Sequence, residues 1–485
     1  MRYRSTRDTS PTPVTVPFRY ALERGIAPDG GLYVPVSVPR VDDTTLRRWI
    51  DVFHEDGYAA LATEVIGRFV DDISRDDLEQ MCRRAYSIDT FASREVTPVS
   101  KVGPMWLLHL SNGPTAAFKD IAMQMLAEFF ADMLARSGQT LTILGATSGD
   151  TGSSAEYAMR RIEGVNVVML TPAGRMTPFQ RAQMYGLNDP SITNVAIDGV
   201  FDDCQDIVKA ITADADCVAR YRIGAVNSIN VARLVAQVVY YVAAWIQVSG
   251  DMSRPVSFSV PTGNFGDICA GHIARTLGVP IDRLIVATNE NDVLDEFFST
   301  GRYRVRDRAH TLATSSPSMD ISKASNFERF IFDVVGADAV RTRELFAQRV
   351  AVEGEFNLAG TAEFEAISTR FGFLSGRSTH ADRVATIRAV NERYGVLIDP
   401  HTADAWHVGQ TLLDTGAVTT PLVVLETALP VKFADTIVEA TGEEPPIPAR
   451  FRGILDTDQH VVELPADVDA VRALIEQKAA NSNIE

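Results

Sequence analysis

Residues 141–161 read LTILGATSGDTGSSAEYAMRR, and this stretch decides the fold class. Residues 141–144 form a short apolar run with β-branched members, which predicts a buried strand. A turn rich in glycine and threonine follows at residues 145–152, and residues 153–161 have the composition of a helix. A strand, a glycine turn and a helix in this order are one half of a parallel βαβ unit.

The same alternation recurs along the chain and predicts an α/β protein. Further short apolar, β-prone runs are followed by longer segments with helical period. These strand candidates are residues 165–170, 194–197, 256–260, 284–287 and 422–425.

The length of 485 residues exceeds what one hydrophobic core usually supports, so we expect several domains. Residues 1–98 read as an N-terminal subdomain, because a turn-rich stretch at 25–35 precedes an amphipathic helical stretch at 46–84. We expect a smaller domain at 99–240 and a larger one at 241–485. Within the larger domain, residues 320–393 read as a helical insertion without strong strands.

The formal net charge of −17, with no offsetting Lys/Arg run, argues against a nucleic-acid partner. The four cysteines are scattered, which fits reduced thiols in a cytoplasmic protein and indicates no metal site. The N-terminus has no apolar segment typical of a secretory signal. Residues 234–248 are apolar but short for a membrane span and contain Gln237 and Gln247, so we expect a buried helix and no membrane partner.

Two glycine turns are candidate anion sites, because ligands of open α/β sheets lie at the carboxyl ends of strands. The turn at 145–152 precedes a helix, whose N-terminus suits a carboxylate or phosphate. Taken alone, it is equally well explained as a capped turn without ligand. The turn at 261–267, PTGNFGD, lacks the lysine of a P-loop and the GxGxxG spacing, so a single phosphate group fits it better than a nucleotide.

Lys119 is a candidate nucleophile at the start of a predicted helix, in NGPTAAFKD at residues 112–120. Schiff-base chemistry needs a lysine that is partly desolvated by apolar neighbours. A surface lysine at a helix start is the commoner explanation of such a residue. The other motifs of the chain change that balance.

Taken together, the GPTAAFKD segment at 113–120, the loop at 146–152 and the GNFG loop at 263–266 resemble the threonine synthase family. The resemblance extends over most of the chain. The N-terminal segments 3–7 and 27–35, the segment NSINVARL at 227–234, and the blocks SPSMDI at 316–321 and SNFER at 325–329 also resemble family motifs, the last two being typical of its longer-chain branch. The resemblance implies two open, twisted, mostly parallel sheets flanked by helices, as in the β subunit of tryptophan synthase. It also implies pyridoxal 5′-phosphate as cofactor and a monomer.

The family pattern assigns roles to individual positions. Lys119 matches the catalytic lysine that binds the cofactor as a Schiff base. The cofactor-binding positions are Lys119, Asp150, Gly263, Asn264, Phe265, Gly266 and Thr427. The positions matching the substrate carboxylate site are Thr147, Ser148 and Thr151. Those matching the substrate phosphate site are Asn227, Ser228 and Arg233, and a guanidinium suits a phosphate dianion in geometry and charge.

The chain departs from the family pattern at three positions. Thr427 matches the threonine that meets the pyridine nitrogen, but Leu429 and Val431 replace the His and Ala that usually follow it. The frequent His-Gly-Pro-Thr of the family begins here with Asn112. These differences concern local detail and substrate range.

The resemblance implies a pyridoxal-phosphate-dependent carbon–oxygen lyase that converts O-phospho-L-homoserine and water to L-threonine and phosphate. Two alternatives stay open at the level of sequence. One is a phospholyase acting on O-phosphothreonine or O-phosphoserine, and the other is a ligand-binding homologue without activity. An intact Lys119 argues against the second.

Overall fold

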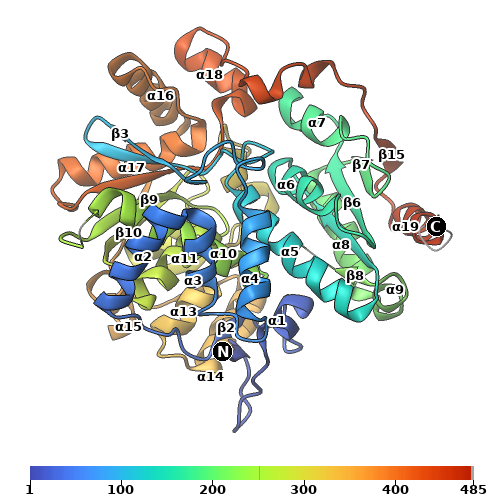
Figure 1. Cartoon of the computed structure of the whole chain (residues 1–485), viewed down its shortest axis with the longest axis horizontal. Coiled ribbons are helices and arrows are strands. Elements are labelled where there is room, and N and C mark those ends of the chain that lie inside the picture. Colours follow the sequence, from blue (N-terminus) through green and yellow to red (C-terminus); the bar gives the residue numbers. More distant parts are fainter. Residues whose placement is uncertain (225, 251, 482–485) are drawn as a thin grey trace. The chain divides into compact units, whose positions relative to one another are not determined.

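The computed structural model describes residues 1–224, 226–250 and 252–481. They form two compact units: unit 1 is Met1–Asn112 with Ser228–Glu444, and unit 2 is Gly113–Asn227 with Pro445–Glu485. Each unit has its own sheet with flanking helices (Figure 1). The predicted α/β class is confirmed.

The six-stranded sheet of unit 1 is parallel except at one edge. Strand β3 pairs with β4 in the antiparallel sense, and every other neighbouring pair is parallel. In spatial order the strands are β13 (Phe373–Arg377), β10 (Ile281–Thr288), β9 (Val256–Pro261), β14 (Leu422–Glu426), β4 (Met105–His109) and β3 (Val99–Val102). Two small antiparallel ribbons complete the strands of unit 1: β1 (Tyr3–Ser5) with β2 (Tyr33–Pro35), and β11 (Arg302–Arg304) with β12 (Glu355–Asn357).

Helices cover both faces of this sheet. In chain order, the helices of unit 1 begin with α1 (Phe18–Arg24), α2 (Asp43–Asp56), α3 (Tyr58–Ile66), α4 (Arg75–Ala85), α10 (Val231–Ser249), α11 (Gly266–Leu277) and α12 (Val293–Thr300). They continue with α13 (Phe327–Val334), α14 (Ala339–Arg343), α15 (Ala362–Thr369), α16 (His380–Tyr394), α17 (Pro400–Asp414) and α18 (Ala434–Thr441). Short helical segments are η1 (Arg308–His310), η2 (Pro317–Met319), the π-helix η3 (Glu344–Glu353) and η4 (Pro430–Phe433). Helices α16, α17 and α18 share one apolar core with β4, β10 and β14.

Helix α10 is the central helix of unit 1. Among the described residues it is the one helix long and apolar enough to cross a membrane, but 89% of its most apolar window is buried. It packs against α3, α11 and β9. The prediction of a buried helix at 234–248 is therefore confirmed.

The five-stranded sheet of unit 2 is parallel throughout. In spatial order its strands are β15 (Val462–Pro465), β7 (Ile192–Asp198), β6 (Val165–Pro172), β5 (Leu141–Ala146) and β8 (Ile223–Gly224). The helices are α5 (Lys119–Ser137), α6 (Asp150–Met159), α7 (Pro178–Tyr185), α8 (Phe201–Ala213), α9 (Ala215–Tyr221) and α19 (Val468–Asn481), with η5 (Ala449–Phe451) and η6 (Ile454–Asp456). Helices α8, α9 and α19 pack on one face of the sheet, while α6, flanked by α5 and α7, also contacts β6.

All six predicted strands are present, because each combines an apolar run with a turn on both sides. Strand β13 was not expected, since it lies inside the segment interpreted as helical; five residues at a sheet edge, with Gly376 among them, give a weak strand signal. The unit boundaries at 112 and 227 also differ from the predicted 98 and 240. The C-terminal residues join unit 2 because β15 and α19 pack on β7 and α8, a long-range pairing that local sequence patterns do not show.

Candidate active site

Lys119 and Asp150 form an ion pair with little solvent exposure in unit 2. Each is the first residue of a helix, α5 and α6 respectively, and α6 begins before residue 153, where the sequence predicted its start. Lys119 Nζ lies 3.5 Å from Asp150 Oδ2, and the two side chains are 13% and 5% exposed. The positive end of the α6 dipole stabilises the Asp150 carboxylate, which in turn attracts the lysine ammonium.

The turn before Lys119 is held by the carboxylate of Asp120. Thr115 donates its N–H to Asp120 Oδ2 at 2.8 Å and its hydroxyl to Oδ1 at 2.6 Å. The same hydroxyl is 2.9 Å from Ser154 Oγ of α6. Ala116 adopts φ +56°, a left-handed conformation that costs a non-glycine residue energy and persists only where neighbours hold it. The turn is therefore a constrained support for Lys119.

The loop after β5 is organised by Thr147. Its Oγ accepts the N–H groups of Gly149, at 3.0 Å, and Gly152, at 2.9 Å. Thr147 is buried, Ser148 is exposed and Thr151 is half-buried. Thr147 thus orders the loop through its oxygen and keeps its hydroxyl proton for donation, while Ser148 is accessible to a ligand.

The GNFG turn of unit 1 connects β9 to α11. Phe265 adopts φ +62° and ψ 9°, and the N–H groups in the first turn of α11 have no acceptor within the helix itself. A Cβ on Gly263 would lie 2.9 Å from Met319 Cα and 3.2 Å from the Ser318 carbonyl oxygen. Only glycine fits against that backbone, and the result is a tight cradle of main-chain donors at a helix N-terminus, which suits a phosphate.

Arg329 connects this cradle to other segments of unit 1 by hydrogen bonds. Its Nε donates to the Tyr33 carbonyl at 3.0 Å, and its two terminal nitrogens donate to the Asn326 side chain and to the Ile229 carbonyl. Asn326 in turn donates its N–H to the Asn264 carbonyl at 3.0 Å. Burial lowers the pKa of Arg329 to about 10. One buried guanidinium therefore joins the N-terminal segment, the segment before α10 and the GNFG turn.

A buried histidine holds the backbone that closes over Gly263. The Ser318 N–H donates to His401 Nε2 at 3.1 Å, which leaves Nδ1 as the protonated nitrogen. His401 Nδ1 lies 2.8 Å from Asp399 Oδ1 and donates to it. The aspartate thus fixes the tautomer of the histidine, and the histidine fixes Ser318 against the cradle.

Arg233 lies in the first turn of α10, whose N-cap Asn230 accepts the Ala232 N–H at 3.1 Å. The side chain of Arg233 is buried, and burial lowers its pKa to about 10. A bound anion would offset the cost of that buried charge. Of the other two residues predicted for the same role, Asn227 is exposed at the end of a segment of unit 2, and Ser228 begins a segment of unit 1 with its hydroxyl 3.2 Å from Ser325 Oγ.

Thr427 follows β14 and is buried next to an ionic cluster. The carboxylate of Glu426 lies 2.5 Å from His109 Nδ1 and accepts a hydrogen bond from Ser111. Burial lowers the pKa of His109, but the hydrogen bond and the charge of Glu426 outweigh that effect and raise it overall. The carboxylate of Glu426 is therefore already paired with His109 and Ser111, whereas Thr427 has a neutral hydroxyl.

These features fit pyridoxal phosphate. Unit 2 by itself has a lysine amine beside a carboxylate. Unit 1 by itself has a glycine turn at a helix N-terminus, packed too closely against backbone to admit a Cβ, and a neutral buried hydroxyl at the end of a parallel strand. The cradle needs no lysine of its own, as expected for one phosphate group.

Several residues that build the site were not predicted from the sequence. They are Gln180 and Gln183 of α7, Asn326, Arg329, Asp399 and His401. The Thr-x-x-Gln pattern at 177–180, a capping-box signature, was available in the sequence and marks the start of α7. The contacts of Arg329 with Ile229 and of His401 with Ser318 span more than 80 residues and leave no local pattern.

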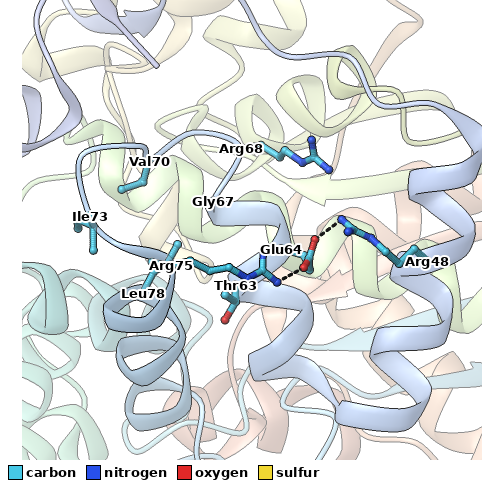
Figure 2. Close-up of a pocket in the computed structure, with 9 residues that line it drawn as sticks. All are labelled: Arg48, Thr63, Glu64, Gly67, Arg68, Val70, Ile73, Arg75 and Leu78. Carbon is cyan, nitrogen blue, oxygen red and sulfur yellow. Dashed lines mark hydrogen bonds and ion pairs between the residues drawn. The ribbon is translucent and has the colours of Figure 1, made fainter.

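A pocket of about 340 Å³ in unit 1 is a separate feature (Figure 2). None of the predicted site residues lines it. Glu64 accepts hydrogen bonds there from both Arg48 and Arg75, so the carboxylate already compensates part of the arginine charge. We do not assign the active site to it.

Known proteins share this architecture. Residues 93–367 match the family described as pyridoxal-phosphate dependent enzyme, residues 2–86 match the threonine synthase N terminus, and residues 402–475 match the threonine synthase C-terminal family. Threonine synthase from Corynebacterium glutamicum is 61% identical over 100% of both chains, and threonine synthase from Methylobacillus glycogenes is 50% identical over 98% of this chain and 99% of the relative. The crystal structure of pyridoxal-phosphate-bound threonine synthase from Brucella melitensis is 38% identical, covers 99% of both chains and has a TM-score of 0.91. The structure of threonine synthase from yeast has the same TM-score at 34% identity and the same coverage.

The two parallel sheets, the lysine at a helix start and the glycine cradle thus define a pyridoxal-phosphate-dependent enzyme of fold type II. The agreement extends through both terminal regions, which are the parts specific to one branch of that class. The chain belongs to the threonine synthase family.

Proposed function

We propose that this chain converts O-phospho-L-homoserine and water to L-threonine and phosphate. The observation that supports this substrate best is the 61% identity, over the full length of both chains, to the Corynebacterium glutamicum protein named threonine synthase. The buried Arg233 adds a local reason, because a site for a phosphorylated substrate needs a cation apart from the cofactor cradle.

We propose the cofactor-binding roles that the family pattern assigns. Lys119 would hold pyridoxal phosphate covalently, and Asp150 would face the hydroxyl of the cofactor ring. Gly263, Asn264, Phe265 and Gly266 would bind the cofactor phosphate, and Thr427 would meet the ring nitrogen with its hydroxyl.

The substrate would be held at both ends. Thr147, Ser148 and Thr151 would bind its carboxylate near the N-terminus of α6, where the helix dipole favours an anion. Asn227, Ser228 and Arg233 would bind its phosphate.

Pyridoxal phosphate, when bound, supplies an electron sink for the negative charge that forms on the substrate. The Lys119 amine would remove the proton from Cα and, in a second step, one proton from Cβ. The electron pair of the Cβ–H bond then forms a Cβ–Cγ double bond as the Cγ–O bond to phosphate breaks, and the lysine ammonium would deliver a proton to Cγ. Arg233 would stabilise the departing phosphate. The same lysine would take a proton from the water that adds at Cβ, which forms the hydroxyl of threonine, and would return a proton to Cα.

A panel of phospho-amino acids tests the proposal. Purified enzyme is incubated separately with O-phosphohomoserine, O-phosphothreonine and O-phosphoserine, and both released phosphate and threonine are measured, with borohydride-reduced enzyme as the blank. We expect equal amounts of phosphate and threonine from O-phosphohomoserine. Phosphate with a keto acid from either of the other two, and no threonine, would make the chain a phospholyase, and no turnover of any of them would favour the non-catalytic alternative.

We also propose a cytoplasmic monomer. The four cysteines are buried thiols, which suits a reducing compartment. Light scattering after size-exclusion chromatography measures the mass directly, and a value near the chain mass of 53.0 kDa is expected.

A further inference from the structure

Helix α7 carries two glutamines one turn apart, and both donate toward the lysine region of unit 2. Gln180 Nε2 donates to Asp150 Oδ1 at 3.0 Å, and Gln183 Nε2 donates to the Thr115 carbonyl at 2.8 Å. Both glutamines are buried. One short helix therefore contacts the carboxylate next to Lys119 and also the turn that precedes Lys119.

The capping box of α7 fixes the orientation of the Gln180 amide. The Thr177 N–H donates to Gln180 Oε1 at 3.3 Å, while Thr177 Oγ accepts the Gln180 N–H at 3.2 Å. Since Oε1 is used as an acceptor, Nε2 is the atom that faces Asp150. Pro178 at the first helical position sets the start of the helix, so the donor is placed by the backbone.

The two carboxylate oxygens of Asp150 have different partners. Oδ1 accepts the amide of Gln180, and Oδ2 is the oxygen 3.5 Å from Lys119 Nζ. The side chain also packs against the loop, because a Cβ on Gly149, which has φ +137°, would lie 2.8 Å from Gln180 Cδ. The rotation of the carboxylate relative to the lysine thus depends on Gln180.

Gln183 contacts the turn that precedes Lys119, the other member of the Lys119–Asp150 pair. The Thr115 carbonyl accepts its amide, and the N–H and hydroxyl of the same threonine hold Asp120, the residue after Lys119. The strained Ala116 lies between these contacts. A buried carbonyl that loses its donor keeps the cost of its desolvation, which favours release of such a turn.

We infer that Gln180 and Gln183 are positioning residues for the catalytic lysine, and that α7 sets the geometry of the Lys119–Asp150 pair from both sides. The inference rests on the proposed role of Lys119. It also implies a hydrogen-bonding requirement at position 180: the side chain of Gln180 must donate a hydrogen bond to Asp150.

Gln180→Glu is the decisive variant, because it reverses this one interaction and keeps the fold. Glutamate at the third helical position is an equally good capping-box partner, and the helix N-terminus favours its charge. Against Asp150, however, it places a second carboxylate where the amide donated. Two adjacent carboxylates share a proton at low pH and repel each other at high pH.

The expected result is therefore a loss that grows with pH. Below the pH at which the two carboxylates, that of the introduced glutamate and that of Asp150, lose their shared proton, this proton replaces the amide hydrogen. In that range kcat stays within about threefold of the wild type. Above it, kcat falls by about 10- to 100-fold, as misplacement of a catalytic group by about 1 Å does. The added negative charge also favours the protonated cofactor linkage and moves the pH midpoint of the visible cofactor absorbance upward by about 0.5–1 unit.

Gln410→Glu is the matched control. Gln410 Nε2 donates to Asp414 Oδ1 at 2.8 Å in α17 of unit 1, so the same substitution faces the same type of partner on the surface. We expect its kcat profile and absorbance midpoint to equal those of the wild type. Gln183→Met, which removes the second donor at similar volume, should lower kcat about tenfold and leave the absorbance midpoint in place.

The outcomes separate this inference from the proposed function. An absorbance midpoint and kcat profile of Gln180→Glu equal to the wild type overturn the inference, whatever the substrate. If the wild type does not convert O-phosphohomoserine but the midpoint of Gln180→Glu still moves while that of Gln410→Glu does not, the proposed substrate is wrong and the positioning role stands. A shift of the same size in both variants overturns the inference, because it would reflect only the added charge.

Discussion

The lysine region of unit 2 and the GNFG region of unit 1 are built on the same plan but work through different atoms. Both place a glycine-containing turn between a parallel strand and a helix N-terminus. The lysine region presents side chains, Lys119 and Asp150, and adjusts them with other side chains. The GNFG region presents backbone, and its neighbours Ser318 and Met319 also approach with backbone atoms.

This difference determines how each region can fail. A side chain that does chemistry can be removed while its surroundings stay folded, so the loss falls on turnover. A backbone cradle has no group to remove and is disrupted by an added atom, so the loss falls on affinity for the cofactor. Variants that lose turnover can therefore be distinguished from variants that lose cofactor.

Lys119→Ala should have the largest effect. We expect turnover to fall by at least about 10³-fold, because the variant loses the covalent anchor and the proton carrier together. The fold should stay intact, as judged by circular dichroism. Peptide mapping after borohydride reduction of the wild type should find the pyridoxyl group on Lys119, and recovery on Lys101, Lys323 or Lys432 would contradict the assignment.

Arg233→Ala tests whether the substrate phosphate has its own site. The cofactor absorbance should stay as in the wild type, while kcat/KM for O-phosphohomoserine falls by roughly 10²- to 10³-fold, since a buried charged partner contributes about 3–4 kcal/mol. Arg233→Lys should recover part of the loss, because lysine restores the charge without the planar fork. If Arg233→Ala instead lost the cofactor and regained full activity with excess pyridoxal phosphate, Arg233 would belong to the cofactor site.

Gly263→Ala should weaken cofactor binding and leave the chemistry unchanged. The added methyl group meets Met319 Cα at 2.9 Å, a backbone atom that cannot move aside like a flexible side chain. We expect the Kd for pyridoxal phosphate to rise about 10- to 100-fold, as an overpacked site costs about 1–3 kcal/mol. Excess cofactor should restore kcat in this variant, which it cannot do in Lys119→Ala, and a kcat that stays low at saturating cofactor would refute the distinction between the two regions.

Glu156→Gln should have the smallest effect and bears on stability alone. Glu156 is buried in α6, and desolvation raises the pKa of its carboxyl well above the usual value. A side-chain hydrogen bond from Asn194 lowers the pKa in part without offsetting the burial, and a protonated Glu156 or a glutamine amide could donate to the buried Asn194 Oδ1. Stability contributed by such a group is complete below the unfolded pKa near 4.5 and is lost as the pH rises toward the folded pKa, by up to about 1.4 kcal/mol per unit. Thermal unfolding should show little gain for the variant at pH 5 and a gain of several degrees at pH 8, and a constant difference across this range would contradict a neutral Glu156.

The sequence by itself determined the α/β class, the six predicted strands and the buried α10, because apolar runs between turns are local signals. It also pointed to Lys119 and the GNFG turn through their local motifs, and the family resemblance added Asp150. Tertiary structure alone decided the membership of β13, the transfer of the C-terminal residues to unit 2, and the roles of Gln180, Arg329 and His401. The physical reason is that these depend on pairing between distant segments: an amide, a guanidinium or an imidazole has no position-specific meaning until folding sets its partner within hydrogen-bond distance.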